Sequence, residues 1–149
     1  MTPTSGESIL SSLTIGASVE EVTKVSEWLE GIAEQDGWPA SLRFGLELAL
    51  EEAVVNVIDY GFEGSTETPL IRVEYFRLPD HKVAVRIVDN GVAFDPTAAR
   101  QPDLADSVEE AGIGGHGIRL MRHFLSEIAY ARVGGHNQLT LIAGLKPSE

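Results

Sequence analysis

The chain has 149 residues, of which 43% are hydrophobic, and its 23 acidic residues outnumber the 11 basic ones to give a net charge of −12 at pH 7. This length suits one domain with a sizeable core, and the negative charge disfavours binding to nucleic acid or to an anionic membrane surface. There is no cysteine for disulfide or thiolate chemistry, and no signal-peptide or membrane-span pattern, so we expect a single cytoplasmic domain over residues 1–149.

The first part of the chain carries one strand pattern followed by two helical patterns. Residues 8–15 are typical of an edge strand, and Ser18-Val19-Glu20-Glu21 has the spacing of a helix-capping box. Apolar residues at helical spacing predict a helix after that box. Gly37-Trp38-Pro39 ends this helix, and a second one is predicted over about residues 40–60.

The second part of the chain predicts two hairpins with a loop and a short helix between them. In chain order these are strands 70–78 and 82–89, joined by a turn at Pro79-Asp80, a loop 96–112, a helix 117–125, and strands 127–133 and 138–145, joined by Gly134-Gly135. Helices mixed with antiparallel pairs favour an α+β fold. We expect a two-layer α/β sandwich, with helices on one face of a mixed, mostly antiparallel sheet.

Glu52 and Asn56 are four residues apart and therefore share one face of the second predicted helix. Asn56 stands in one of the most apolar stretches of the chain, and a buried amide needs hydrogen-bonding partners. Two interpretations stay open. An isolated Glu-x-x-x-Asn is more often a solvated polar stripe, whereas the apolar surroundings favour a ligand or a polar network.

Asp89-Asn90-Gly91 follows a hydrophobic strand. Sequences of this kind commonly make only a turn. The functional alternative uses the Asp89 carboxylate to accept a hydrogen bond from an exocyclic amine, while Gly91 lets the backbone approach a flat ring.

Gly112-Ile113-Gly114-Gly115-His116-Gly117 literally matches the dinucleotide pattern G-x-G-x-x-G. That pattern requires a preceding apolar strand within a βαβ unit. Here an acidic segment precedes the glycines and a hairpin follows the helix, so the dinucleotide interpretation is excluded. A phosphate site remains, because glycine amides and the start of a helix both attract anions.

Together and in this order, the three motifs resemble those of the GHKL (Bergerat-fold) ATPases, and within them the anti-sigma-factor serine/threonine kinases. The matching segments are Glu52-x-x-x-Asn56 (the N box), Asp89-x-Gly91-x-x-Phe94-Asp95 (the first glycine box) and Gly114-Gly115-His116-Gly117 (the second glycine box). The ending of the chain is also similar to that subfamily. The resemblance covers about residues 8–145 and implies the Bergerat ATP-binding fold.

The resemblance also implies a role for each matching position. Asn56 coordinates Mg²⁺ that bridges the phosphates of ATP, and Glu52 is the general base for the attacking hydroxyl. At the base, the implied contacts are Asp89 with the adenine amino group, Gly91 beside it, and Thr140 through water. At the phosphates, the implied contacts are Gly114, Gly115, His116 and Gly117, with residues 96–113 as the ATP lid.

The implied activity is that of a Mg-ATP-dependent serine/threonine protein kinase. Such a protein phosphorylates a STAS-type anti-anti-sigma partner, otherwise sequesters a sigma factor, and forms a homodimer. The alternative is a nucleotide-loaded module that switches partners without phosphoryl transfer. Retention of Glu52 favours the enzyme, and an ATPase acting on water ranks last. The sequence names neither the partner nor the sigma factor.

Overall fold

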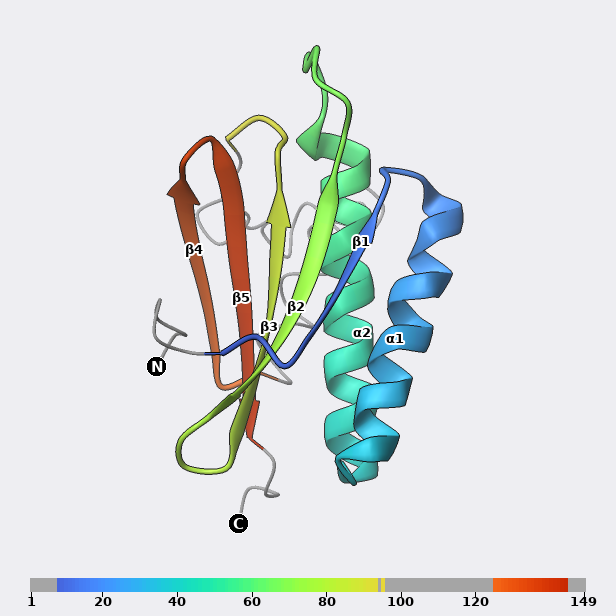
Figure 1. The fold of residues 1–149 in the computed structure, drawn as a ribbon, viewed down its shortest axis with the longest axis vertical. Helices are drawn as coiled ribbons and strands as arrows, with labels where there is room; N and C mark the ends of the chain where they lie inside the picture. The colour runs from blue at the N-terminus through green and yellow to red at the C-terminus, as the bar shows by residue number, and fades with distance from the viewer. Residues whose placement is uncertain (1–7, 94, 96–124, 145–149) are drawn as a thin grey trace, which may run out of the picture.

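The computed structural model describes residues 8–93, 95 and 125–144 (Figure 1). Its elements, in chain order, are β1 (Ser11–Ile15), the 3-10 turn η1 (Val19–Glu21), α1 (Val22–Gln35), α2 (Ala40–Asn56), the π-helical turn η2 (Val57–Gly61), β2 (Ile71–Leu78), β3 (Lys82–Asp89), β4 (Glu127–Val133) and β5 (His136–Gly144). The expected lid, the glycine cluster at 114–117 and nearly all of the helix predicted after it lie outside the described residues.

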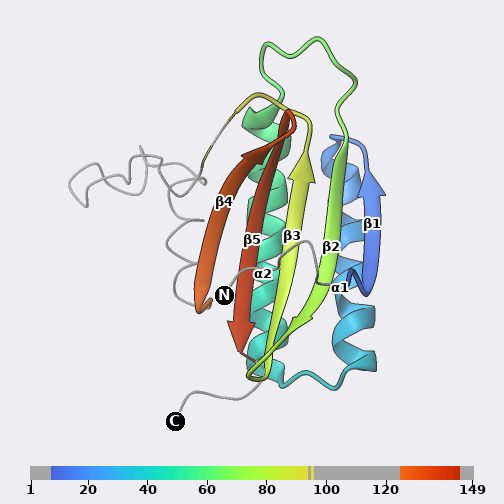
Figure 2. The ribbon, with the colours of Figure 1, turned by 60° about the vertical axis from the view of Figure 1, so that its left-hand side comes forward.

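The strands form one five-stranded sheet in the order β1-β2-β3-β5-β4, and every pairing among the described residues is antiparallel. Both expected hairpins are present, and β1 is an edge strand that pairs with β2. α1 and α2 lie side by side on one face of the sheet (Figures 1 and 2). The predicted α+β sandwich is therefore confirmed.

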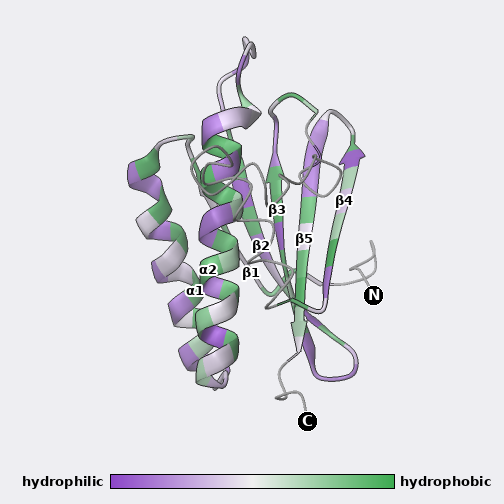
Figure 3. Ribbon diagram, turned by 180° about the vertical axis from the view of Figure 1, so that it is seen from behind, coloured by the Kyte–Doolittle hydropathy of each residue, from purple (hydrophilic) through white to green (hydrophobic). Residues whose placement is uncertain are grey.

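The core lies between the two helices and the sheet. α1 turns Val25, Leu29 and Ile32 inward, which is the spacing of one helical face. On the sheet, alternate residues of β3, such as Val85 and Ile87, meet them because side chains of a strand point to opposite faces in turn. Figure 3 shows β3 as largely hydrophobic, whereas β5 begins with hydrophilic residues.

The turns follow local sequence rules. Gly134 and Gly135 join β4 to β5 with φ angles of 56° and 79°, a left-handed pair that glycine adopts without strain. Ser18 caps η1 rather than α1 itself, since its hydroxyl accepts a hydrogen bond from the Glu20 amide at 3.3 Å. The second predicted helix has the expected length, but its last turn, η2, is π-helical.

Candidate functional site

Asn56 is the last residue of α2 and is 6% exposed. Glu52 lies one turn earlier on the same helix, where it is half-buried and its Oε2 atom is shielded from solvent. The neighbouring Glu51 has a different environment, because it accepts a hydrogen bond of 2.7 Å from the Ser26 hydroxyl of α1. Of these two adjacent carboxylates, Glu51 therefore links the helices.

The turn η2 connects the end of α2 to the end of β3. The amide of Val92 donates a hydrogen bond of 2.7 Å to the carbonyl of Gly61, the last residue of η2. A π-helical turn holds one residue more than an α-helical turn, and such turns are frequent at functional sites. The contact brings the end of α2 and the end of β3 to the same end of the molecule, the upper end in Figure 1.

Asp89 is the last residue of β3 and is 4% exposed. Its Oδ1 atom accepts two hydrogen bonds, from the amide of Gly91 at 2.9 Å and from the side-chain amide of Asn137 at 3.0 Å. Asp89 lies an even number of residues along β3 from Val85 and Ile87, so its side chain points to the same face of the sheet, the one that faces the helices. Its carboxylate is thus fixed on the helix side of the sheet.

Gly91 is held by contacts on three sides. Its amide donates to Asp89, its carbonyl accepts a hydrogen bond of 2.9 Å from Arg132, and a Cβ atom added to it would lie 2.2 Å from the carbonyl oxygen of Gly61. The sequence motif implied room for a flat ring at this glycine. In the structure the immediate requirement for glycine is the close approach of another backbone.

Asn137 belongs to the site although the sequence motifs did not single it out. It is 4% exposed, lies directly opposite Asp89 in the pairing of β3 with β5, and also donates a hydrogen bond of 2.8 Å to the carbonyl of Val92. The Tyr130 hydroxyl on β4 bonds to its side-chain oxygen. A polar residue at the start of a hydrophobic strand is a signal that the sequence contains. The residue to which Asn137 bonds, however, depends on which strands pair.

Thr140 requires a correction. It lies in register with Arg86 on β3 and Ala129 on β4, an odd number of residues from Asn137, so its side chain is on the sheet face that points away from the helices. Its neighbours on that face include the ion pair of Arg86 with the buried Glu74, at 2.8 Å. The structure therefore does not bring Thr140 together with Asp89, and the residue of β5 that bonds to Asp89 is Asn137.

The remaining expected site residues, Gly114, Gly115, His116 and Gly117, lie outside the described part of the chain. Within residues 8–93, 95 and 125–144, no three His, Cys, Asp or Glu side chains gather as a metal-binding group. No helix of the described part is long and apolar enough to cross a membrane.

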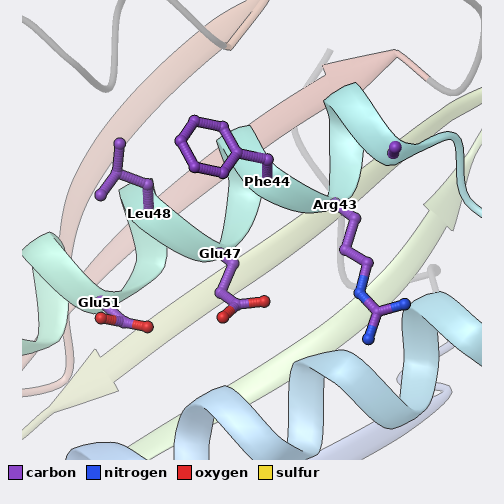
Figure 4. A pocket seen from close by; sticks show the side chains of 6 residues that line it. Arg43, Phe44, Glu47, Leu48 and Glu51 are labelled. Atoms are coloured by element: carbon purple, nitrogen blue, oxygen red, sulfur yellow. The ribbon is translucent and has the colours of Figure 1, made fainter.

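A separate hollow of about 360 Å³ lies along the outer side of α2 and contains none of the expected site residues. Figure 4 shows the lining side chains of α2, with Phe44 and Leu48 on one side and Arg43 and Glu47 turned toward α1. Burial, and then the charges of Glu30 and Glu51, raises the pKa of Glu47. The raised pKa of Glu47 thus follows from its burial and its acidic neighbours, and it does not indicate a ligand.

Comparison with known families and curated proteins gives a consistent result. Residues 15–143 match the model of the histidine kinase-like ATPase domain. The serine/threonine-protein kinase BtrW of Bordetella bronchiseptica is 39% identical over 135 residues, which is 91% of this chain and 94% of that protein. The serine-protein kinase RsbW of Listeria monocytogenes is 33% identical over 104 residues, which is 67% of this chain and 65% of that protein.

Among solved structures, the histidine kinase domain of a blue-light activated histidine kinase from Erythrobacter litoralis is similar in fold. The superposition has a TM-score of 0.54 and covers 97% of this chain and 66% of that one, at 13% sequence identity. At this identity the similarity concerns the fold alone.

Proposed function

The chain belongs to the histidine kinase-like ATPase domain family, and from that premise we propose that it is a Mg-ATP-dependent serine/threonine protein kinase acting in partner switching. Relatives that match most of its length carry the name of serine or serine/threonine-protein kinase. The proposal also needs a place for the nucleotide, and the place that we propose is formed by the residues around the ends of α2 and β3.

The observation that carries the proposal is the fixed carboxylate of Asp89. The Gly91 amide and the Asn137 side chain both donate to its Oδ1 atom, and among the described residues none donates to Oδ2. A buried carboxylate with one oxygen left for a further donor suits the exocyclic amine of adenine, because the acceptor is already positioned before the base arrives.

Asn56 suits the Mg²⁺ that accompanies ATP. An amide oxygen is a hard ligand, and Mg²⁺ in nucleotide sites is usually held by one or two protein groups together with the phosphates rather than by a complete protein cage. The buried Asn56 at the end of α2 fits that pattern. When bound, the ion would neutralise negative charge on the phosphates.

Glu52 is the proposed general base. It lies one helical turn before Asn56, so both side chains leave the same surface of α2. Its role is to orient a substrate hydroxyl and accept its proton as the phosphoryl group is transferred. The neighbouring Glu51 is a poor candidate, since its carboxylate reaches α1, where the Ser26 hydroxyl donates to it.

The proposed protein substrate is a STAS-type anti-anti-sigma protein, and the proposed second partner is a sigma factor that the kinase sequesters. We further propose that Gly114, Gly115, His116 and Gly117 contact the phosphates and that the protein acts as a cytoplasmic homodimer. These proposals rest on the sequence motifs and on the family to which the chain belongs.

The decisive experiment is transfer of label from γ-³²P-ATP, with Mg²⁺, to the STAS protein encoded nearest to this gene. Label on a serine or threonine of that protein is the expected result, and it should disappear when EDTA removes the magnesium. Tight nucleotide binding without any transfer would favour the alternative, a nucleotide-loaded binding module without catalysis. Release of inorganic phosphate with no labelled protein would instead indicate an ATPase acting on water.

A further inference from the structure

A row of hydrogen bonds leads from a tyrosine on the edge strand β4 to the carboxylate of Asp89. We propose that Tyr130 is a positioning residue for nucleobase recognition, and that it acts through Asn137 to hold Asp89 with its Oδ2 atom left for an exocyclic amine. The inference deepens the proposed function and rests on it, but no known motif of the sequence assigns a role to Tyr130.

The direction of each hydrogen bond in this row follows from chemistry. The Asp89 carboxylate and the Val92 carbonyl accept hydrogen bonds, so the end of the Asn137 side chain that meets both of them is its NH₂ group. The other end is therefore the oxygen, and the Tyr130 hydroxyl must donate to it. All the bonds run the same way, from Tyr130 through Asn137 to Asp89.

Bonds that run in one direction polarise one another, most strongly where water is excluded. Asn137 is 4% exposed and Asp89 is 4% exposed, so the row meets that condition. Donation from Tyr130 makes the Asn137 NH₂ group a better donor to Asp89, and it also fixes that group in space. The effect of Tyr130 on a ligand would thus be exerted at Asp89.

Tyr130 is well placed to act as a fixed anchor. Its ring packs against the core between the helices and the sheet, and its backbone pairs with Leu139 of β5. Two positions further along β4, Arg132 donates to the carbonyl of Gly91 at 2.9 Å. β4 therefore supports both sides of the turn that follows Asp89.

This arrangement makes the site selective for a donor on the base. Asn137 and the Gly91 amide both bind Oδ1, so the ligand meets the remaining acceptor, Oδ2. A base with an amine at that point can donate a hydrogen bond to Oδ2. A base without the amine loses this bond, and a base with a carbonyl there places acceptor against acceptor.

The test combines a protein change with a ligand change. Tyr130→Phe removes only the hydroxyl, and purine riboside 5′-triphosphate differs from ATP only in lacking the exocyclic amine. Calorimetric titration with Mg²⁺ present gives the affinity of both proteins for both nucleotides. The preference for ATP over the analogue is then compared between the two proteins, and the change in that preference measures the coupling between the Tyr130 hydroxyl and the amine.

The matched control is Tyr75→Phe, which removes a hydroxyl that donates to Asp36 at 2.7 Å, on the same sheet but outside this row. Thermal unfolding of all variants measures any general loss of structure.

In wild-type protein ATP should bind more tightly than the analogue. Tyr130→Phe should weaken the binding of ATP about 3- to 10-fold and the binding of the analogue by less than about twofold, so that the preference for the nucleotide with the amine becomes smaller. Tyr75→Phe should keep the wild-type preference.

If Tyr130→Phe keeps the wild-type preference for ATP over the analogue, whether or not both affinities fall by the same factor, the positioning role is overturned and the proposed function still stands. Wild-type protein that binds neither nucleotide would overturn the proposed function and this inference together.

Discussion

The carbonyl oxygen of Gly61 occupies the place where a side chain at Gly91 would begin. A Cβ atom on Gly91 would lie 2.2 Å from that oxygen and 2.9 Å from the Gly61 carbonyl carbon. The end of helix α2, through its π-helical turn, therefore rests directly on the turn after β3. This contact sets the distance between the helix that carries Asn56 and the strand that carries Asp89.

Replacing Gly91 by alanine should force these two backbones apart. The clash is with backbone rather than with a flexible side chain, so we expect a destabilisation of about 1–3 kcal/mol, typical of overpacking. Urea unfolding measures this free energy. Gly31→Ala is the control, because nothing lies within 4 Å of its added Cβ, and alanine in an exposed helix should stabilise by about 0.5–1 kcal/mol. Equal stability of Gly91→Ala and wild type would contradict the contact.

Asp89→Asn should weaken ATP binding about 10- to 100-fold, because an amide in that place presents a donor to the adenine amine and leaves donors opposed. Isothermal titration measures the change. Asp36→Asn serves as the control, since the Asp36 carboxylate also accepts a side-chain hydrogen bond, from the Tyr75 hydroxyl at 2.7 Å, but lies outside the proposed site. Unchanged ATP affinity in folded Asp89→Asn protein would remove the adenine role.

Asn56→Ala should act mainly through the metal. We expect nucleotide affinity in EDTA to stay near the wild-type value, while the gain in affinity on adding Mg²⁺ is largely lost. Asn56→Asp keeps an oxygen ligand and should retain much of that gain. If the alanine variant responds to Mg²⁺ as the wild type does, Asn56 does not hold the ion.

Glu52→Gln should separate binding from catalysis. The substitution keeps the volume and removes the basic carboxylate, so Mg-ATP should bind nearly normally while transfer to the protein substrate falls about 10²- to 10⁴-fold. The matched control is the adjacent Glu51→Gln, which alters the 2.7 Å bond to Ser26 and should reduce stability more than transfer. If Glu52→Gln transfers phosphate to the protein substrate about as fast as wild type, Glu52 is not the general base.

Glu47→Gln should stabilise the protein at neutral pH. Burial and the nearby Glu30 and Glu51 raise the pKa of Glu47 above its ordinary value of 4.5, so the folded state favours its protonated form. The stability that this proton contributes is complete below 4.5 and is lost as the pH rises through the raised pKa. The melting temperature of Glu47→Gln should therefore exceed that of wild type at pH 7, and the gap should close in acid.

Local patterns in the sequence were sufficient to predict the helices and strands that the structure describes. The two helical periodicities, the alternating strands and the glycine turn at residues 134–135 all appear close to where they were predicted. These signals are local, since a helix face repeats within a turn and a strand alternates every second residue. The order of the three motifs likewise indicated the family, because it is a property of the linear chain.

The tertiary structure alone decided which polar residues meet. Asn137 is 48 residues from Asp89 and becomes its partner only because β5 pairs beside β3 in one particular register. The same register turns Thr140 to the other sheet face, since a shift by an odd number of residues reverses the side of a strand on which a side chain lies. The need for glycine at position 91 likewise arises from the carbonyl oxygen of Gly61, which lies at the end of a helix and not on the strand that precedes Gly91. Register and helix docking are set by burial of the whole core, so no local stretch of sequence contains them.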